Sequence, residues 1–290
     1  MVVPGMLQNA PVRNWLGGIE PAWTLLDPAS FSALQKPPSS PAGAIRLATD
    51  LSPDEIGKSA VARNAIILLH AAAVSPGLQL TATGNLTRKV VAEMLDVFTW
   101  PGFDRTEVFR LHKVINEPDF LPLFFIRHLV ETGRLVRRRK DHLKIAAPGL
   151  QVIEDPGRQA IQALLFHLAL WAIDLGYFGR AIDHGWPQRD AGIVLWSLSI
   201  AAGEWQPPER LTRMCTIPTS DMLDAKWDTA THAMEATILR PLWWFGLLDR
   251  RQDDIPGQTF AKKHFYRKTP LFDRLISFDV KLEAATGPRH

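Results

Sequence analysis

The chain has 290 residues, of which 46% are hydrophobic and 22% charged, and its formal net charge at pH 7 is +3. These ordinary globular values exclude wholesale disorder, and the length suffices for one large core or two smaller ones. So small a positive excess does not identify a nucleic-acid-binding protein, which only local clustering of charge could do. The single cysteine, Cys215, excludes an intrachain disulfide and a CxxC redox or metal pair, and a cytoplasmic location is therefore expected.

The most apolar part of the chain does not predict a membrane span. Residues 160–178 contain Gln162, His167 and Asp174, whereas a spanning helix needs about 20 mostly uncharged apolar residues. Residues 1–15 also lack a basic segment followed by a continuous apolar run, so a cleaved signal peptide is not expected. We expect a protein without a membrane partner, in which 160–178 is a buried helix.

The first 51 residues are rich in proline. Seven prolines occur there, and the stretch KPPSSPAG at 36–43 is the densest. Because proline fixes φ and removes a hydrogen-bond donor, we predict a Pro-rich extension over 1–51 that is extended, draped or disordered. Its Trp15, Trp23 and Phe31 indicate that part of it packs onto the rest of the protein.

Residues 52–155 are predicted to form a helical region with a first winged-helix-like module. Ser52, Pro53 and Glu55 form a capping-box pattern for a helix that should run to about Ala73. A short strand (LQLT, 78–81), a helix of amphipathic spacing ending near Phe98, a helix near 105–114 and an apolar helix over 120–133 follow. Gly133 should end the last of these with a positive φ.

The stretch GRLVRRRKDHLKI, residues 133–145, predicts two strands around a turn near Lys140 and Asp141. Pro148 then opens a short helix. The order helix, helix, helix, basic hairpin, helix is typical of a winged helix-turn-helix.

The second half of the chain, 156–290, repeats this plan more loosely. GLLDRRQDDI, at 246–255, begins with the same spacing of Gly, Leu and Arg-Arg as 133–138, and it should pair with FAKKHFYRK at 260–268. Gly246 and Pro270 then correspond to Gly133 and Pro148. The predicted fold class is mainly α with small β-hairpins, in which tandem winged-helix-like modules are joined by buried helices.

Two stretches resemble a known group of proteins. LTATGNLTRKVVAEM (80–94) followed by GRLVRRRKDHLKIAAPG (133–149) is similar to a module of uncharacterised, often plasmid-borne bacterial proteins. The resemblance implies a winged-helix-like fold and a bacterial origin. It implies no catalytic residue.

The basic hairpin, 134–144, carries the candidate nucleic-acid-binding residues Arg137, Arg138, Arg139, Lys140 and Lys144. They could lie along the phosphates of double-stranded DNA. They could equally keep an edge hairpin soluble, which sheets commonly require. The preceding helix offers only Arg127, His128 and Glu131 for contacts with base edges, so reading of a specific sequence is not expected.

Signatures of catalysis are scarce in the sequence. It has no GxSxG, P-loop, GxGxxG, HExxH or zinc-spaced Cys/His set, so no catalytic residue, cofactor or metal is predicted. Asp183 and His184 fit a turn better than an acid/base pair, His167 fits a hydrogen-bonded core position, and Cys215 fits a structural thiol.

We therefore predict a non-enzymatic binding or regulatory protein of bacteria that contacts nucleic-acid backbone through the basic hairpin. A protein–protein adaptor, or a self-associating protein, that uses the modules as packing surfaces is the alternative. An enzyme with an unrecognised site is the second alternative.

Overall fold

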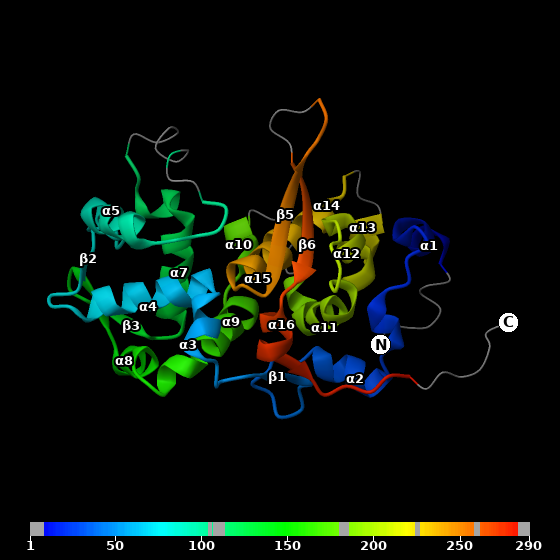
Figure 1. Ribbon diagram of the computed structural model, residues 1–290, viewed down its shortest axis with the longest axis horizontal. Helices are drawn as coiled ribbons and strands as arrows, with labels where there is room; N and C mark the ends of the chain where they lie inside the picture. Colours follow the sequence, from blue (N-terminus) through cyan, green and yellow to red (C-terminus); the bar gives the residue numbers. More distant parts are fainter. Residues whose placement is uncertain are drawn as a thin grey trace. The chain divides into compact units, whose positions relative to one another are not determined.

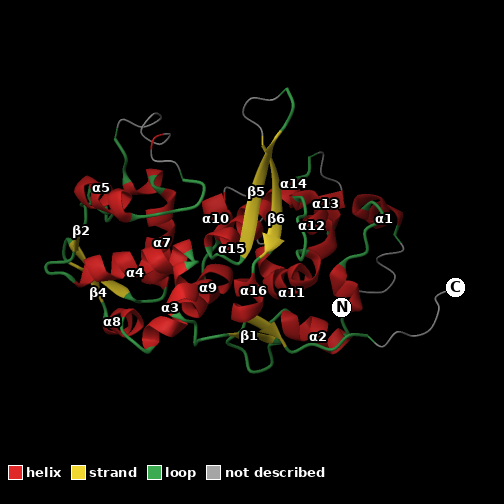
Figure 2. Cartoon of the chain, in the orientation of Figure 1, coloured by secondary structure: helices red, strands yellow, loops and turns green. Residues whose placement is uncertain are grey.

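The computed structural model describes residues 9–103, 106, 114–179, 186–223, 227–257 and 262–283 (Figure 1). It is mainly helical with a few small sheets, which confirms the mainly-α prediction at that level (Figure 2). Contacts between residues divide the chain into two compact units. We call them the 48–174 unit, which also includes 243–246, and the 175–290 unit, which comprises 1–47, 175–242 and 247–290. The boundaries of these two units differ from those of the predicted domains, 1–51, 52–155 and 156–290. The division into these three domains stays a prediction.

The 48–174 unit combines helices with one antiparallel sheet of strand order β2-β4-β3. Its helices are α3 (Pro53–Gly57), α4 (Ala60–Ala73), α5 (Arg88–Val97), α7 (Leu121–Thr132), α8 (Ala147–Ile153) and α9 (Ile161–Trp171), with 3-10 turns η3 (Glu117–Asp119) and η4 (Gly157–Ala160). Its strands are β2 (Leu78–Gln79), β3 (Val136–Arg139) and β4 (His142–Ile145). The helix predicted near 105–114 lies almost wholly outside the described residues.

The helix predicted from Ser52 to Ala73 is two helices. The capping box of Ser52 and Glu55 is present and begins α3, but α3 ends at Gly57. Ser59 then caps α4, because its side chain accepts a hydrogen bond from the Ala62 amide at 3.1 Å. Ser59 is fully buried, so this second cap is satisfied inside the protein. The single-helix prediction was wrong because it overlooked the second cap.

The end of α7 differs from the prediction by one residue. Gly133 has a φ of −74°, so the expected left-handed glycine is wrong, and the left-handed residue is Arg134 with a φ of 54°. The Leu135 amide then donates to the Val130 carbonyl at 2.8 Å. A bond that reaches back five residues across a left-handed residue is the usual C-terminal closure of a helix.

The 175–290 unit is built from short helices, one long hairpin and a small two-stranded sheet. Its helices are α1 (Ala10–Leu16), α2 (Pro28–Leu34), α10 (Leu175–Gly179), α11 (Ala191–Ala201), α12 (Pro208–Cys215), α13 (Ser220–Leu223), α14 (Thr229–Met234), the first residues of α15 (Arg240–Trp244), and α16 (Pro270–Leu275). Its shorter turns are η2 (Ala22–Leu25), η5 (Gln188–Asp190) and the π-helical turn η6 (Glu235–Leu239). Strand β5 (Leu248–Asp254) pairs with β6 (Lys262–Lys268), and β1 (Ile45–Leu47) pairs with β7 (Ile276–Phe278). The predicted second hairpin is thus present.

The Pro-rich segment is not extended over its described part, 9–47. Pro11 and Pro28 lie in the first turns of α1 and α2, where a missing amide hydrogen costs nothing. Leu34 and Ile45 are fully buried, and β1 adds a strand to β7. The expectation of extended or disordered backbone was wrong where Pro11 and Pro28 begin helices. The expectation that part of the segment packs onto the rest of the protein is confirmed, because Trp23 is buried and donates to the Thr216 carbonyl at 2.8 Å.

A helix, a hairpin and a second helix follow one another twice in the chain: α7, β3–β4 and α8, and later α15, β5–β6 and α16. In the 175–290 unit, Gln206 bridges Tyr266 of β6, just as β2 pairs with β4 in the other unit. Gly246 has a φ of 72°, and the Leu247 amide donates to the Leu242 carbonyl at 2.9 Å. By its φ and by this hydrogen bond, Gly246 is similar to Arg134 and not to Gly133, one residue away from the predicted alignment.

A backbone hydrogen bond joins the start of the helix after each hairpin to the residue that follows Arg134 or Gly246. Leu135 accepts a hydrogen bond from the Ala146 amide at 2.8 Å, and Leu247 accepts one from the Thr269 amide at 3.0 Å. Both bonds place the start of the closing helix beside the start of its hairpin. Among the described residues, no helix is long and apolar enough to cross a membrane.

Candidate nucleic-acid interface

Strands β3 and β4 form the predicted basic hairpin. Its turn is Lys140 and Asp141, and Lys140 has a φ of 53°, a conformation that a non-glycine residue rarely adopts. Arg137 lies opposite Lys144, and Arg139 opposite His142. The predicted turn and pairing are therefore confirmed.

The basic side chains of this hairpin are displayed to solvent. Arg137, Arg138, Arg139 and Lys140 are exposed, and Lys144 is half-buried. Arg138 faces the same side of the sheet as the buried Leu143, with which it is paired. Arg138 stays exposed because β3 is an edge strand. Its guanidinium lies over the turn at Gly84: one of its nitrogens is 2.9 Å from the position that a Cβ on Gly84 would take.

None of these five cations forms an ion pair with a carboxylate among the described residues, although Lys140 lies close enough to Asp141 to help lower the pKa of that carboxyl. The hairpin's one acidic residue, Asp141, bonds to His142 Nδ1 at 2.8 Å. Hydrogen bonds from its own backbone amide and from His142 hold the pKa of Asp141 below its usual range, so the group is charged at neutral pH. The hairpin still carries a clear local excess of positive charge.

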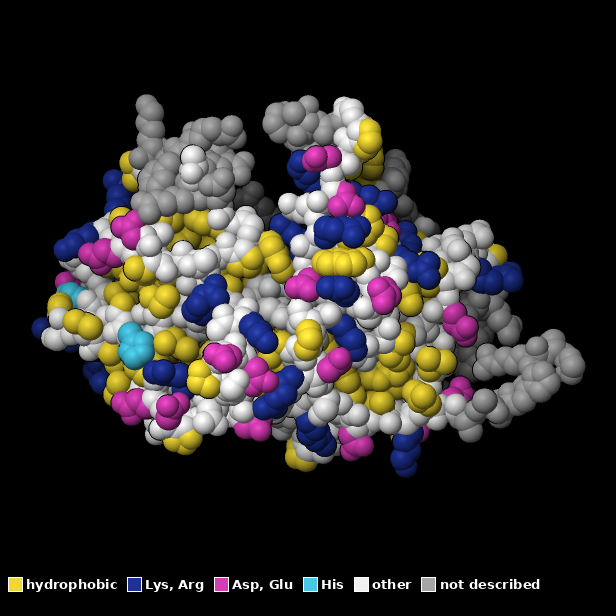
Figure 3. Space-filling view, viewed as in Figure 1, with side chains coloured by type: hydrophobic (Ala, Val, Ile, Leu, Met, Phe, Trp, Pro, Cys, Tyr) yellow, Lys and Arg dark blue, Asp and Glu magenta, His cyan; other side chains and the backbone are white. Residues whose placement is uncertain are grey.

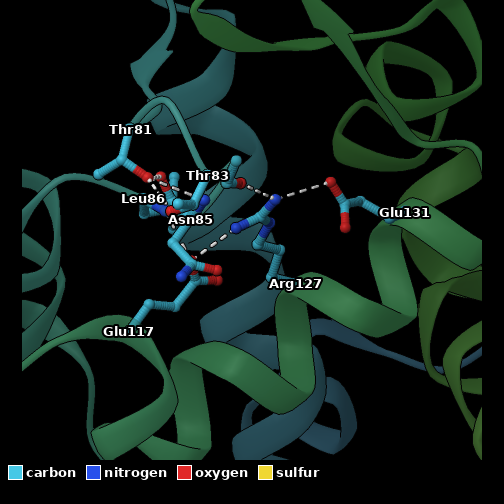
Figure 4. Close-up of polar contacts among 8 residues, drawn as sticks. Thr81, Thr83, Asn85, Leu86, Glu117, Arg127 and Glu131 are labelled. Carbon is cyan, nitrogen blue, oxygen red and sulfur yellow. Dashed lines mark hydrogen bonds and ion pairs between the residues drawn. The ribbon is translucent and has the colours of Figure 1, made fainter.

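Helix α7 has little to offer to base edges. Arg127 is largely buried, and its guanidinium bonds to Glu117 at 2.5 Å and to the Gly84 carbonyl at 2.7 Å (Figure 4). The ring of His128 contacts that of Phe124 in a tilted arrangement, with centroids 4.9 Å apart. The polar side chains of this helix are thus engaged inside their own unit, which agrees with the expectation of weak sequence reading.

The second hairpin carries more charges, and several of its cations pair with its own carboxylates. Arg267 lies 3.5 Å from Asp249, Arg251 lies 3.2 Å from Asp253, and Lys262 is paired with Asp254. In the space-filling view, basic and acidic side chains alternate along it (Figure 3).

Aromatic rings hold the same cations of the second hairpin. The Arg251 guanidinium lies 5.3 Å from the ring of Trp205 and 4.7 Å from that of Phe265, and Arg267 lies 4.7 Å from Trp205. Such contacts are worth about 0.5–1 kcal/mol each at exposed sites. The cations of this hairpin are therefore engaged within the protein.

The other residues considered from the sequence do not form a site. Asp183 and His184 lie outside the described residues. His167 stacks on Trp171 at 5.7 Å, and partial burial lowers its pKa. Cys215 is fully buried, and burial raises the pKa of its thiol, as befits a structural cysteine. No group of His, Cys, Asp and Glu side chains in the described part of the chain could hold a metal ion.

Sequence reasoning missed a groove in the 48–174 unit. It has a volume of about 740 Å³ and is lined by the turn after β2, the start of α5 and η3. The available signal was TATGNLT, 81–87, in which three threonines, a glycine and an asparagine precede Arg88 and Lys89. From the sequence this stretch predicts only the end of a strand, and it carries part of the resemblance described above, but neither points to a groove.

Comparison with known proteins reaches about a third of the chain. Residues 57–158 match the family model of the Y4jL N-terminal domain, a range that contains the basic hairpin and the groove. A stretch of 99 residues is 36% identical to the protein named "Uncharacterized protein y4jL" of Sinorhizobium fredii (strain NBRC 101917 / NGR234). The match spans 34% of this chain and 44% of that relative's length. No solved structure matches.

Proposed function

We propose that the chain is a non-enzymatic bacterial binding protein that contacts the phosphate backbone of double-stranded DNA through the β3–β4 hairpin. In this proposal each unit contributes a winged-helix-like module. The strand order β2-β4-β3, the Gln206–Tyr266 bridge beside β5–β6, and the helices before and after each hairpin support that assignment.

The observation that carries the proposal is the state of the charges on the first hairpin. Four consecutive residues, 137–140, are exposed cations, and the three arginines among them form no ion pair with a carboxylate among the described residues. Solubility of an edge strand requires fewer cations than this. Phosphate contacts explain their number, because each cation that neutralises a phosphate releases condensed counterions and so favours binding.

Binding of this kind is weakly selective for sequence. Phosphate contacts position a protein on DNA but carry no base information. Helix α7 adds no free polar side chain for the major groove, since Arg127 is held by Glu117 and Gly84. We expect unrelated duplexes to compete within a few-fold of one another.

Fluorescence anisotropy with a labelled duplex at low salt tests the proposal. The parent should bind, and the combined Arg137→Gln, Arg138→Gln and Arg139→Gln variant should lose most of its affinity. The matched control is Arg250→Gln with Arg251→Gln on the second hairpin, which should bind like the parent. If the parent does not bind at low salt, the adaptor function takes the place of this one, and a nuclease-resistant protein partner should then be recovered from a native lysate.

A further inference from the structure

Of the three exposed arginines in the β3–β4 hairpin, Arg138 is placed differently from the other two. Side chains alternate between the two faces of a strand, so Arg137 and Arg139 lie on one face and Arg138 on the other. Arg138 pairs with Leu143, which is fully buried, so its side chain starts on the core side of the sheet. It therefore runs along the surface of the unit before it reaches solvent.

The guanidinium of Arg138 is held at two places. Its Nε donates to the Lys140 carbonyl at 3.3 Å, and its Nη1 and Cζ lie 2.9 and 3.7 Å from the position that a Cβ on Gly84 would take. Only glycine leaves this space open. Neither Arg137 nor Arg139 forms a hydrogen bond or an ion pair with its side chain among the described residues. Arg138 is thus the ordered member of the three.

The turn that supports Arg138 is fixed by the interior of its own unit. The Gly84 amide donates to the Thr81 carbonyl at 2.9 Å, and the Gly84 carbonyl accepts from Arg127 at 2.7 Å. Arg127 is in turn held by the buried carboxylate of Glu117 (Figure 4). A φ of 89° at Gly84 is a conformation that favours glycine. The guanidinium therefore rests on a turn that does not have to order when a ligand binds.

The outer nitrogens of Arg138 remain available. Its Nη groups have no hydrogen-bond partner among the described residues, because Glu117 and Glu131 pair with Arg127 instead. A guanidinium presents its N–H groups as a planar fork that matches two oxygens of one phosphate. A side chain that is already held also loses less conformational freedom on binding than a mobile one.

We propose that Arg138 is the residue that positions the DNA backbone, by binding one phosphate through its Nη groups beside the Gly84 turn. Arg137 and Arg139 contribute charge, and a lysine can replace either of them. This assignment rests on the DNA contact proposed above. It adds that the turn after β2 is part of that contact, because the missing side chain of Gly84 leaves the space that the guanidinium needs.

Three single substitutions, Arg137→Lys, Arg138→Lys and Arg139→Lys, test the assignment by anisotropy with a labelled duplex. Each keeps the positive charge, so the slope of log affinity against log salt should stay that of the parent. Arg138→Lys should weaken binding at least about fivefold, because an ammonium cannot form the fork. Arg137→Lys and Arg139→Lys are the matched controls and should bind within about twofold of the parent.

NMR relaxation of the arginine Nε–Hε groups tests the ordering of Arg138 without DNA. The heteronuclear NOE of Arg138 should be close to that of the ordered backbone, whereas those of Arg137 and Arg139 should be near zero or negative. Equal mobility of the three side chains would overturn the role of the Gly84 turn.

The outcomes separate this assignment from the proposed function. A parent that binds duplex DNA, together with three lysine variants of equal affinity, overturns the assignment and leaves the DNA contact standing. A parent that does not bind at low salt overturns both. If Arg138→Lys lowers the melting temperature along with the affinity, Arg138 supports the fold and does not position DNA. The assignment requires an affinity loss for Arg138→Lys alone, at an unchanged melting temperature.

Discussion

The two hairpins follow equivalent helices and begin at equivalent left-handed residues, yet they use their charges in opposite ways. In β3–β4, the exposed arginines 137–139 form no ion pair with a carboxylate among the described residues. In β5–β6, carboxylates and aromatic rings engage the cations. One backbone arrangement thus leaves charge available for a partner in the first case and uses charge within the protein in the second.

The buried sides of the two hairpins also differ, because the second is anchored by polar groups and the first by apolar side chains. Tyr266 is fully buried, and its hydroxyl donates to Glu235 of the π-helical turn at 2.9 Å, while His264 bonds to the same carboxylate oxygen. The first hairpin has only apolar anchors, Val136 and Leu143. We infer that folding relies on the polar groups of β5–β6 and is largely independent of the arginines of β3–β4.

The largest effect is expected at the left-handed residue of the second hairpin. Gly246→Val should lower the free energy of unfolding by about 2–5 kcal/mol, because a side chain in this conformation is strained and because its Cβ would lie 2.6 Å from the Lys58 carbonyl oxygen. Urea denaturation measures the change. A loss below about 1 kcal/mol would show that the turn can rearrange. The shared left-handed residue would then no longer be evidence that the two hairpins are equivalent.

A smaller effect is expected for Glu235→Gln. Burial alone would raise the pKa of Glu235, but hydrogen bonds from His264 and Tyr266 outweigh it and hold the pKa below the ordinary value of 4.5. The carboxylate therefore stabilises the fold above pH 4.5, and this contribution is lost as the pH falls through the lowered pKa. We expect Glu235→Gln to cost about 1–3 kcal/mol at pH 7 and progressively less in acid.

Denaturation of parent and variant at a series of pH values gives this comparison. The two stabilities should converge below pH 4.5. A difference that stays constant down to strong acid would mean that the hydrogen bonds to Glu235 do not depend on its charge.

Local patterns predicted the elements, whereas their polar partners could not be predicted from sequence. The capping box at Ser52, the turn at Lys140 and the pairing of β5 with β6 follow from short-range chemistry that the sequence displays. The partners of Arg127 could not be foreseen, because Glu117 and Gly84 reach it only through the tertiary fold. The left-handed residue was misplaced to Gly133 because glycine is the usual choice and Arg134 is an exception.

That exception makes Arg134 a test of the shifted alignment. Arg134→Gly should raise the free energy of unfolding by about 0.5–1 kcal/mol, because relief of the strained φ exceeds the entropy that glycine adds to the unfolded chain. Its sign is opposite to that of Gly246→Val at the equivalent position. Destabilisation would indicate that the Arg134 side chain contributes contacts that outweigh the strain.

The smallest stability effect is expected when the second hairpin is made to resemble the first. Changing Asp249, Asp253 and Asp254 to Asn removes three exposed ion pairs, each worth at most about 1 kcal/mol. Thermal stability should change little, and duplex DNA should bind somewhat more tightly because the freed cations can now reach phosphates. Unchanged DNA affinity would show that the rings of Trp205 and Phe265 are enough to keep Arg251 and Arg267 from reaching phosphates.

The salt dependence of DNA binding tests the central claim most directly. Three phosphate contacts by Arg137, Arg138 and Arg139 predict that log affinity falls with log salt with a slope of about −3, at about −0.9 per phosphate. Changing all three to Gln should flatten the slope by about that amount and leave the melting temperature nearly unchanged. A parent that does not bind duplex DNA at low salt, or a triple variant that keeps the parent's slope, would contradict the account.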